Sequence, residues 1–229
     1  MTGRWASLFA RLAASRSGVA ATEFALALPF LLGSGLMGLE MANRAIVSMQ
    51  INQLAAQIAD NGSRIGDTST LENRKIYEAD IDDLLRGARV QSGDHVDLYE
   101  HGRVIISSLE VVPGTDDQQY IHWQRCAGKK HHISSYGLEG DGATAGIAGM
   151  GPAGHEVWAF KDDAVIFVEI SYDYQSIIGP RFGMGGTITS TASFTVRDDR
   201  DLTQIYQRNP DAPDAVEACD KYDDPTSAV

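Results

Sequence analysis

The hydrophobic and polar positions divide the chain into an apolar N-terminal segment and a mixed remainder. No charged residue lies between Phe24 and Leu39. That run would form about 24 Å of helix, whereas the hydrocarbon core of a membrane is roughly 30 Å thick. Uncharged neighbours extend the segment to residues 19–43, with Glu23 and Glu40 near its two ends. The pattern therefore predicts one transmembrane helix.

The helical spacing of apolar residues continues beyond this segment. Asn61 and Gly62 form a typical helix end. We therefore expect a single helix of about forty residues over 19–62, apolar on all sides at first and amphipathic later. The apolar positions beyond the membrane segment are Leu39, Ala42, Ile46, Met49, Leu54, Ala55 and Ile58.

A second helix and a set of strands are predicted next. Ser69-Thr70-Leu71-Glu72 has the spacing of a capping box, and the apolar residues after it predict a helix that ends near Gly87. Runs of β-branched and aromatic residues predict strands at 95–100, 103–112, 119–125, 163–174 and 187–197.

The strand at 163–174 indicates the kind of sheet. In its second half Val168, Ile170, Tyr172 and Tyr174 alternate with Glu169, Ser171 and Asp173. Such alternation predicts a half-buried strand, as in an antiparallel sheet lying on a helix. The fold class that we expect is α+β, with a mainly antiparallel sheet after the long N-terminal helix. We assign Trp123 and the two tyrosines to the core of this sheet.

Two segments lack a regular pattern. Residues 137–154 are rich in glycine and almost free of large apolar groups, so we expect a long surface loop. The acidic tail, residues 209–229, contains three prolines and would be poorly ordered unless Cys219 holds it.

The chain is acidic overall, with 31 Asp and Glu residues against 19 Lys and Arg residues. This balance disfavours a nucleic-acid partner, because phosphate binding needs a basic face. Residues 1–18 differ, since they contain Arg4, Arg11 and Arg16 and no acid. Arginines ahead of an apolar helix predict that the N-terminus stays in the cytoplasm and that the rest of the chain faces outward.

The chain has two cysteines, Cys126 and Cys219. If this part is exported, a disulfide is allowed and would tie the tail to the body. The alternative is two unpaired cysteines that pack separately. Spacing in the sequence does not decide between them, because pairing depends on the distance between the two Cα atoms.

No residue pattern predicts a metal site, a cofactor site or an active site. We expect His122, His131, His132 and His155 to be solvated surface residues, because their spacing matches no zinc site. Turns are the expected structure at Asp116-Asp117 and Asp141-Gly142, which lack the alternating carboxylates of a calcium loop. The chain also lacks a Gly-x-Ser-x-Gly nucleophile elbow.

One short stretch ahead of the apolar run combines three features. A basic leader ends in Gly18, Glu23 follows five residues later, and an uninterrupted apolar helix comes next. This arrangement resembles the processing site of type IV pilins. Residues 20–32, Ala-Ala-Thr-Glu-Phe-Ala-Leu-Ala-Leu-Pro-Phe-Leu-Leu, are similar to the TadE/TadF group in particular. Weaker similarity continues at residues 121–126 and 170–175.

The resemblance implies a minor pilin or pseudopilin of the Tad (tight adherence, Flp) pilus, with a pilin-like fold and a role in pilus biogenesis and adhesion. It implies cleavage by a prepilin peptidase between Gly18 and Val19. It further implies that Glu23, Phe24 and Pro29 act in assembly, with Glu23 meeting the new amine of a neighbouring subunit. The partners implied are the inner membrane, the major pilin and other minor pilins, the Tad inner-membrane platform and the peptidase; no cofactor is implied.

We therefore expect four parts: a leader at 1–18, an assembly helix at 19–62, an extracytoplasmic α+β domain at 63–208 and the tail at 209–229. Two other functions stay open. An uncleaved, single-pass anchored protein would bind or sense something through its sheet domain, without a special role for Glu23. A secreted enzyme would use residues 1–42 as a signal peptide, although Pro29 and the continuing helix do not suit that function.

Overall fold

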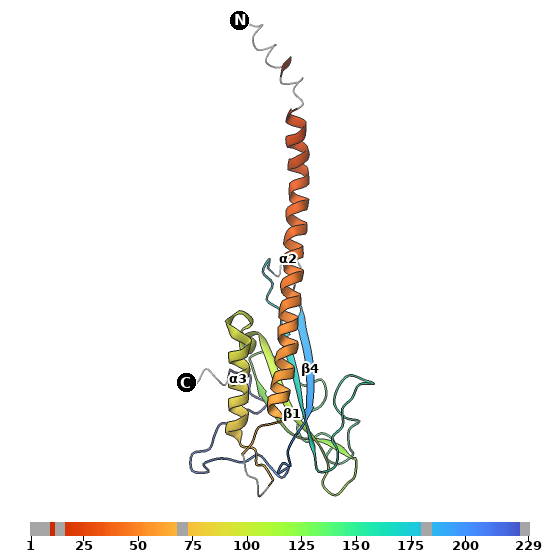
Figure 1. Ribbon diagram of the computed structural model, residues 1–229, viewed down its shortest axis with the longest axis vertical. Helices are drawn as coiled ribbons and strands as arrows, with labels where there is room; N and C mark the ends of the chain where they lie inside the picture. The colour runs from red at the N-terminus through yellow and green to blue at the C-terminus, as the bar shows by residue number, and fades with distance from the viewer. Residues whose placement is uncertain (1–9, 12–16, 68–72, 180–184, 225–229) are drawn as a thin grey trace. The chain divides into compact units, whose positions relative to one another are not determined.

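The computed structural model describes residues 10–11, 17–67, 73–179 and 185–224. The chain divides into two compact units, Met1–Arg44 and Ala45–Val229. Figure 1 shows its elements in chain order, which are α2 (Ser17–Gly62), α3 (Glu78–Val96), α4 (Leu98–His101), β1 (Gly102–Val111), β2 (Gln119–Ala127), β3 (Ala164–Asp173) and β4 (Thr187–Thr195). This arrangement confirms the α+β class.

Helix α2 confirms the prediction of one long helix that ends at Asn61-Gly62. Pro29 lies inside the helix, which continues past it although proline supplies no backbone donor. The glycine at the end has a packing role. A Cβ atom at Gly62 would lie 3.0 Å from Cγ2 of Ile166, so the missing side chain lets the helix end approach strand β3 closely.

Helix α3 differs from its predicted bounds at both ends. The predicted capping box at 69–72 lies outside the described residues. Residues 73–77 are not helical, because Arg74 and Tyr77 form bridges with Arg200 and Tyr206 instead. Gly87 does not end the helix, since the buried positions continue through Ala88, Ser92 and Val96.

The strand predicted at 95–100 is wrong. The last turn of α3 and the short helix α4 occupy this segment, with Asp97 between them in the left-handed conformation at φ 44°. Both Leu98 and Tyr99 are buried, and the Tyr99 hydroxyl donates to the Leu85 carbonyl at 2.7 Å. A half-buried strand would not bury two consecutive side chains, so packing overrides the local β-propensity.

The other four predicted strands are confirmed and form one antiparallel sheet with the order β2-β1-β3-β4. A register irregularity interrupts the β1–β2 pairing between Ser108 and Leu109. The first and last strands in this order have no strand neighbour on their outer sides among the described residues.

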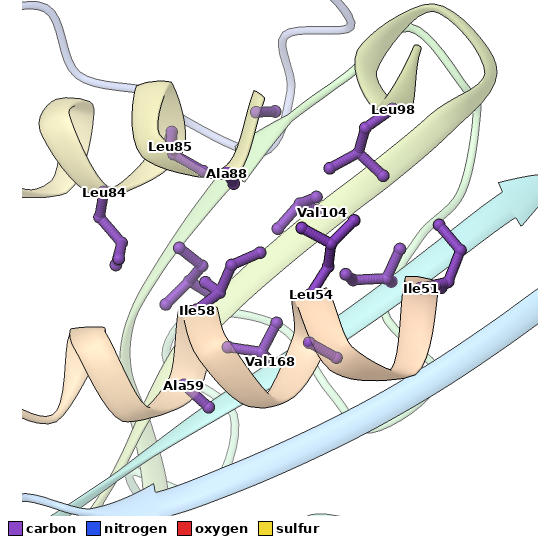
Figure 2. Packing of buried hydrophobic residues seen from close by; sticks show 14 of the residues in the cluster. Ile51, Leu54, Ile58, Ala59, Leu84, Leu85, Ala88, Leu98, Val104 and Val168 are labelled. Carbon is purple, nitrogen blue, oxygen red and sulfur yellow. The ribbon is translucent and has the colours of Figure 1, made fainter. Parts of the chain in front are cut away.

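The larger core lies between one face of this sheet and the helices. Figure 2 shows Ile51, Leu54 and Ile58 of α2 facing Leu85 of α3 and Val104 of β1. The buried residues of α2 recur at helical spacing, as an amphipathic helix requires. Three residues of the predicted apolar face, Leu39, Ile46 and Met49, are exposed instead. Trp123, Tyr172 and Tyr174 also belong to this core, as predicted.

The opposite face of the sheet is buried too, which corrects the prediction of a half-buried strand. On β3, Glu169 and Ser171 are as buried as Val168 and Ile170. Two segments supply the cover. Ser135 donates to the Glu169 carboxylate, and Met150 of the glycine-rich loop packs with Val165 and Phe167 in a second, smaller core. The segment at 137–154 is therefore more than a surface loop, because it places Met150 on the sheet.

Candidate functional site

The residues of the predicted processing and assembly motif all lie in helix α2. The described part of the helix starts at Ser17 and includes the Gly18–Val19 bond. Thr22 donates its hydroxyl hydrogen to the Val19 carbonyl at 2.8 Å. Glu23 follows in the next turn with an exposed side chain. The structure thus places Gly18, Val19 and Glu23 close together on one continuous helix, ahead of its exposed apolar side chains.

The apolar part of α2 exposes large hydrophobic side chains. Phe24 is 61% exposed, Leu26 71% and Phe30 79%. A soluble protein rarely leaves so many large apolar groups on one segment in contact with water. Helix α2 is long and apolar enough to cross a membrane. A Cβ atom at Gly33, Gly35 or Gly38 would meet nothing within 4 Å, so these glycines leave room for a close neighbour.

The body has a different notable feature, which is the way its C-terminal tail is attached. Cys126 of β2 and Cys219 of the tail form a disulfide, the pairing that the sequence left open. Backbone hydrogen bonds hold the tail on both sides of it. The Cys126 amide donates to the Glu217 carbonyl at 2.8 Å, and the Gly128 amide donates to the Asp223 carbonyl at 2.7 Å. The tail therefore lies along the outer edge of β2.

A buried arginine adds to this attachment. Arg103 on β1 is completely buried and donates from Nη1 to the Gly128 carbonyl at 2.9 Å and to the Lys221 carbonyl at 2.5 Å. Its Nη2 donates to the Cys219 carbonyl at 2.8 Å. The Tyr222 ring lies over its guanidinium, 4.2 Å from Cζ to the ring centroid. Burial lowers the pKa of Arg103, and the carbonyl groups stabilise its charge.

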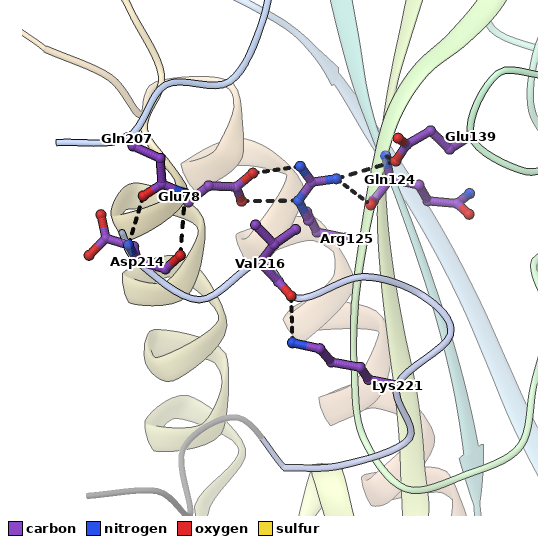
Figure 3. Close-up of polar contacts among 8 residues, drawn as sticks. All are labelled: Glu78, Gln124, Arg125, Glu139, Gln207, Asp214, Val216 and Lys221. Atoms are coloured by element: carbon purple, nitrogen blue, oxygen red, sulfur yellow. Dashed lines mark hydrogen bonds and ion pairs between the residues drawn. The ribbon is translucent and has the colours of Figure 1, made fainter. Parts of the chain in front are cut away.

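A second buried arginine joins β2 to α3. Figure 3 shows Arg125 between Glu78, in the first turn of α3, and Glu139, on the glycine-rich loop. Glu139 Oε2 also accepts a hydrogen bond from the backbone N–H of Gln124 at 2.9 Å. One guanidinium thus faces two carboxylates, and the group carries a net negative charge.

Two of the histidines correct the prediction of solvated surface residues. His122 Nδ1 lies 2.9 Å from Oε2 of the buried Glu110, and His132 Nε2 lies 2.8 Å from Oε1 of the buried Glu169. The hydrogen bond with Glu110 raises the pKa of His122. Within the described part of the chain, no group of three or more His, Cys, Asp or Glu side chains is placed to hold a metal ion.

Sequence reasoning missed the buried charges of the body. Arg103, Glu110, Arg125 and Glu169 all lie within strands that the sequence did predict. A charged residue inside an otherwise apolar strand was therefore the sequence feature that could have indicated a buried charge. The alternation rule placed Glu169 on a polar face of its strand, and it gave no indication of the segments that cover that face.

Comparisons of the chain with protein-family models, with curated proteins and with solved structures find no match.

Proposed function

We propose that this chain is a minor pilin or pseudopilin of a Tad-type pilus, held in the inner membrane by helix α2 with its body outside the cytoplasm. One observation carries the proposal: Gly18 and Glu23 lie on one continuous helix, directly ahead of its exposed apolar stretch. Cleavage after Gly18 would create an amine on Val19. The sequence resemblance to TadE/TadF supplies the class of pilus.

The position of Glu23 supports an assembly role. A carboxylate at mid-membrane costs about 2.5–3.5 kcal/mol on insertion scales and less near an interface. A neighbouring subunit's amine would offset that cost inside a lipid-free bundle of helices. The exposed side chains of Phe24 and its apolar neighbours, together with the open glycine positions, provide surface for such a bundle.

The disulfide supports the orientation. Disulfides persist in oxidising compartments and are rare in the cytoplasm. Both cysteines belong to the body, and the arginines precede the apolar helix. A cytoplasmic N-terminus and an extracytoplasmic body agree with both features.

Intact-mass analysis of the membrane fraction tests the cleavage. In cells with an active prepilin peptidase we expect a mature chain that begins at Val19, and in cells without the peptidase we expect the full-length chain. A chain that retains residues 1–18 in both strains would instead indicate the uncleaved, anchored protein.

Substitution of Glu23 tests the assembly role. We expect Glu23→Ala to insert in the membrane and to be cleaved normally, but to be lost from sheared pili. Asp117→Ala, which removes a carboxylate at an exposed position in the body, is the matched control and should leave incorporation unchanged. Normal incorporation of the Glu23 variant would remove the role proposed for this carboxylate.

A further inference from the structure

A cavity of about 450 Å³ lies on the face of the sheet away from α2 and α3. Its floor is formed by Ile105, Gln124 and Cys126 of strands β1 and β2. Residues 132–134 and 138–139 form one wall, and tail residues 218–220 with Tyr222 form the other. The disulfide fixes the tail wall to the floor. Cavities of this volume suit small organic molecules.

The interior of this cavity is largely apolar. Ile105 and the Cys126–Cys219 bridge provide the buried surface. At the mouth, Ile133 is 66% exposed and Leu138 is 48% exposed. These two side chains leave apolar area in water that a ligand with an apolar body would cover.

The charged groups around the cavity are acidic. Glu139 and Asp220 line it, and none of the described lining residues is a lysine or an arginine. Arg125 Nη1 pairs with Glu139 Oε2 at 3.2 Å, but Glu78 binds the same guanidinium through two hydrogen bonds, so the three groups together keep a negative charge. The Glu139 side chain remains 54% exposed.

Arg103 bonds to the tail wall but does not itself line the cavity. Its Nη atoms donate to three backbone carbonyls, and the Tyr222 ring covers it. Tyr222 also stacks on His131, with 4.2 Å between ring centroids. His132 also lines the cavity, but it is paired with the buried Glu169. The charged groups that a ligand would meet are therefore the carboxylates of Glu139 and Asp220.

From this combination of apolar floor and acidic rim we infer that the cavity binds a small organic cation, a positively charged group on a compact apolar body. The apolar body would lie against Ile105 and the disulfide. The charge would face Glu139 and Asp220. Because water screens these exposed carboxylates, we expect them to favour a cation over a neutral molecule of the same shape without binding it tightly. This inference does not depend on the pilus assignment.

Three probes of nearly equal shape test it: benzylammonium, benzyl alcohol and benzoate. The full chain, labelled at the isoleucine δ1 methyl groups, is titrated in zwitterionic detergent micelles, and the free concentration of each probe is measured from its own NMR signals. We expect benzylammonium to shift the Ile105 and Ile133 signals in the millimolar range. Ile58 and Ile166, in the other core, serve as internal references.

The selectivity is the decisive readout. We expect benzylammonium to bind about threefold more tightly than benzyl alcohol, and benzoate more weakly than either. The double variant Glu139→Gln and Asp220→Asn should remove this preference and leave benzyl alcohol binding unchanged. Asp94→Asn with Asp117→Asn is the matched control, because both residues are exposed and neither lines the cavity. The preference should persist in that control.

A further arm tests the tail wall. Reduction of the disulfide should weaken binding of all three probes, while the Ile58 and Ile166 signals stay in place. Equal or tighter binding of benzoate, absence of shifts at Ile105 and Ile133 with every probe, or a preference unchanged in the double variant would each overturn the inference.

Discussion

Arg125 of strand β2 donates two hydrogen bonds to Glu78 of helix α3, with 2.5 Å from Nη2 to Oε1 and 3.0 Å from Nε to Oε2. The side chains are only 11% and 5% exposed. Although 47 residues separate them in the chain, this bidentate contact sets the start of α3 against the sheet. The geometry of a planar guanidinium makes such a contact specific as well as strong.

Removal of one partner should therefore destabilise the body. We expect Glu78→Gln to lower the free energy of unfolding by about 3 kcal/mol, because the buried guanidinium loses its closest counter-charge. Denaturant unfolding of the full chain in micelles, followed by near-UV circular dichroism, measures this. Asp116→Asn, which breaks the exposed pair with Lys161, should change stability by less than about 0.5 kcal/mol. Similar losses for the two variants would show that the buried pair has no special weight.

The strands were predictable because their residues carry the signal locally. Strands β1, β2, β3 and β4 were found from runs of β-branched and aromatic residues, and α2 from its apolar run and its Asn61-Gly62 end. The segment 95–100 was not, because burial of Tyr99 and its bond to the Leu85 carbonyl depend on residues distant in the chain. Local propensity cannot represent such tertiary contacts.

One candidate site could be predicted from local sequence and the other could not. The Gly18–Glu23 motif is contiguous, so the sequence shows it directly. The cavity combines β1, β2, a loop and the tail, and only the folded chain brings Ile105, Glu139 and Asp220 together. The second buried face of the sheet was missed for the same reason, since Met150 covers it from a glycine-rich segment with few apolar residues.

Asp82 of α3 should make stability depend on pH. Burial raises its pKa from 3.8 to about 6, and the charges of Glu217, Glu78 and Asp214 add to the shift. Because the folded state holds this proton more tightly than the unfolded chain, the stabilisation from protonation is present at low pH. It is lost as the pH rises from 3.8 through about 6.

Asp82→Asn should remove this dependence. We expect it to raise the free energy of unfolding by about 1 kcal/mol at neutral pH, a discounted figure because the side chain is partly exposed. Little change is expected near pH 4. Denaturant titrations across this pH range measure the difference, with Asp117→Asn, an exposed loop position, as the control. A gain that is the same at every pH would contradict the electrostatic explanation.

The Cys126–Cys219 disulfide should stabilise the body and protect the edge of β2. The cysteines lie 93 residues apart, and closing a loop of this length stabilises by roughly 4–5 kcal/mol in the loop-entropy model. We expect the double variant Cys126→Ala and Cys219→Ala to lose much of that stability. Hydrogen exchange should also accelerate at the Gly128 amide, which donates to the tail, but not at the central β1 residue Ile106.

Substitution of two glycines by alanine should distinguish two causes of lost stability, which are a strained backbone conformation and a steric clash. Gly114 and Gly128 both have positive φ, at 86° and 110°. A Cβ atom at Gly114 would meet nothing within 4 Å, whereas one at Gly128 would lie 2.2 Å from the carbonyl oxygen of Gly102. We expect Gly114→Ala to cost about 1 kcal/mol, from the left-handed conformation alone. Gly128→Ala should cost roughly 3 kcal/mol or more, because the strand end must also move.

That movement has a second consequence, since Gly128 is bonded to both Arg103 and the tail. Its carbonyl accepts from Arg103, and its amide donates to Asp223. Gly128→Ala should therefore speed hydrogen exchange in the tail, and Gly114→Ala should not. Unfolding measurements and exchange on the two variants check both effects. If the two variants lose equal stability and exchange in the tail is unchanged, the close approach of the chain at Gly128 does not hold the tail. The disulfide and Arg103 would then be sufficient to hold it.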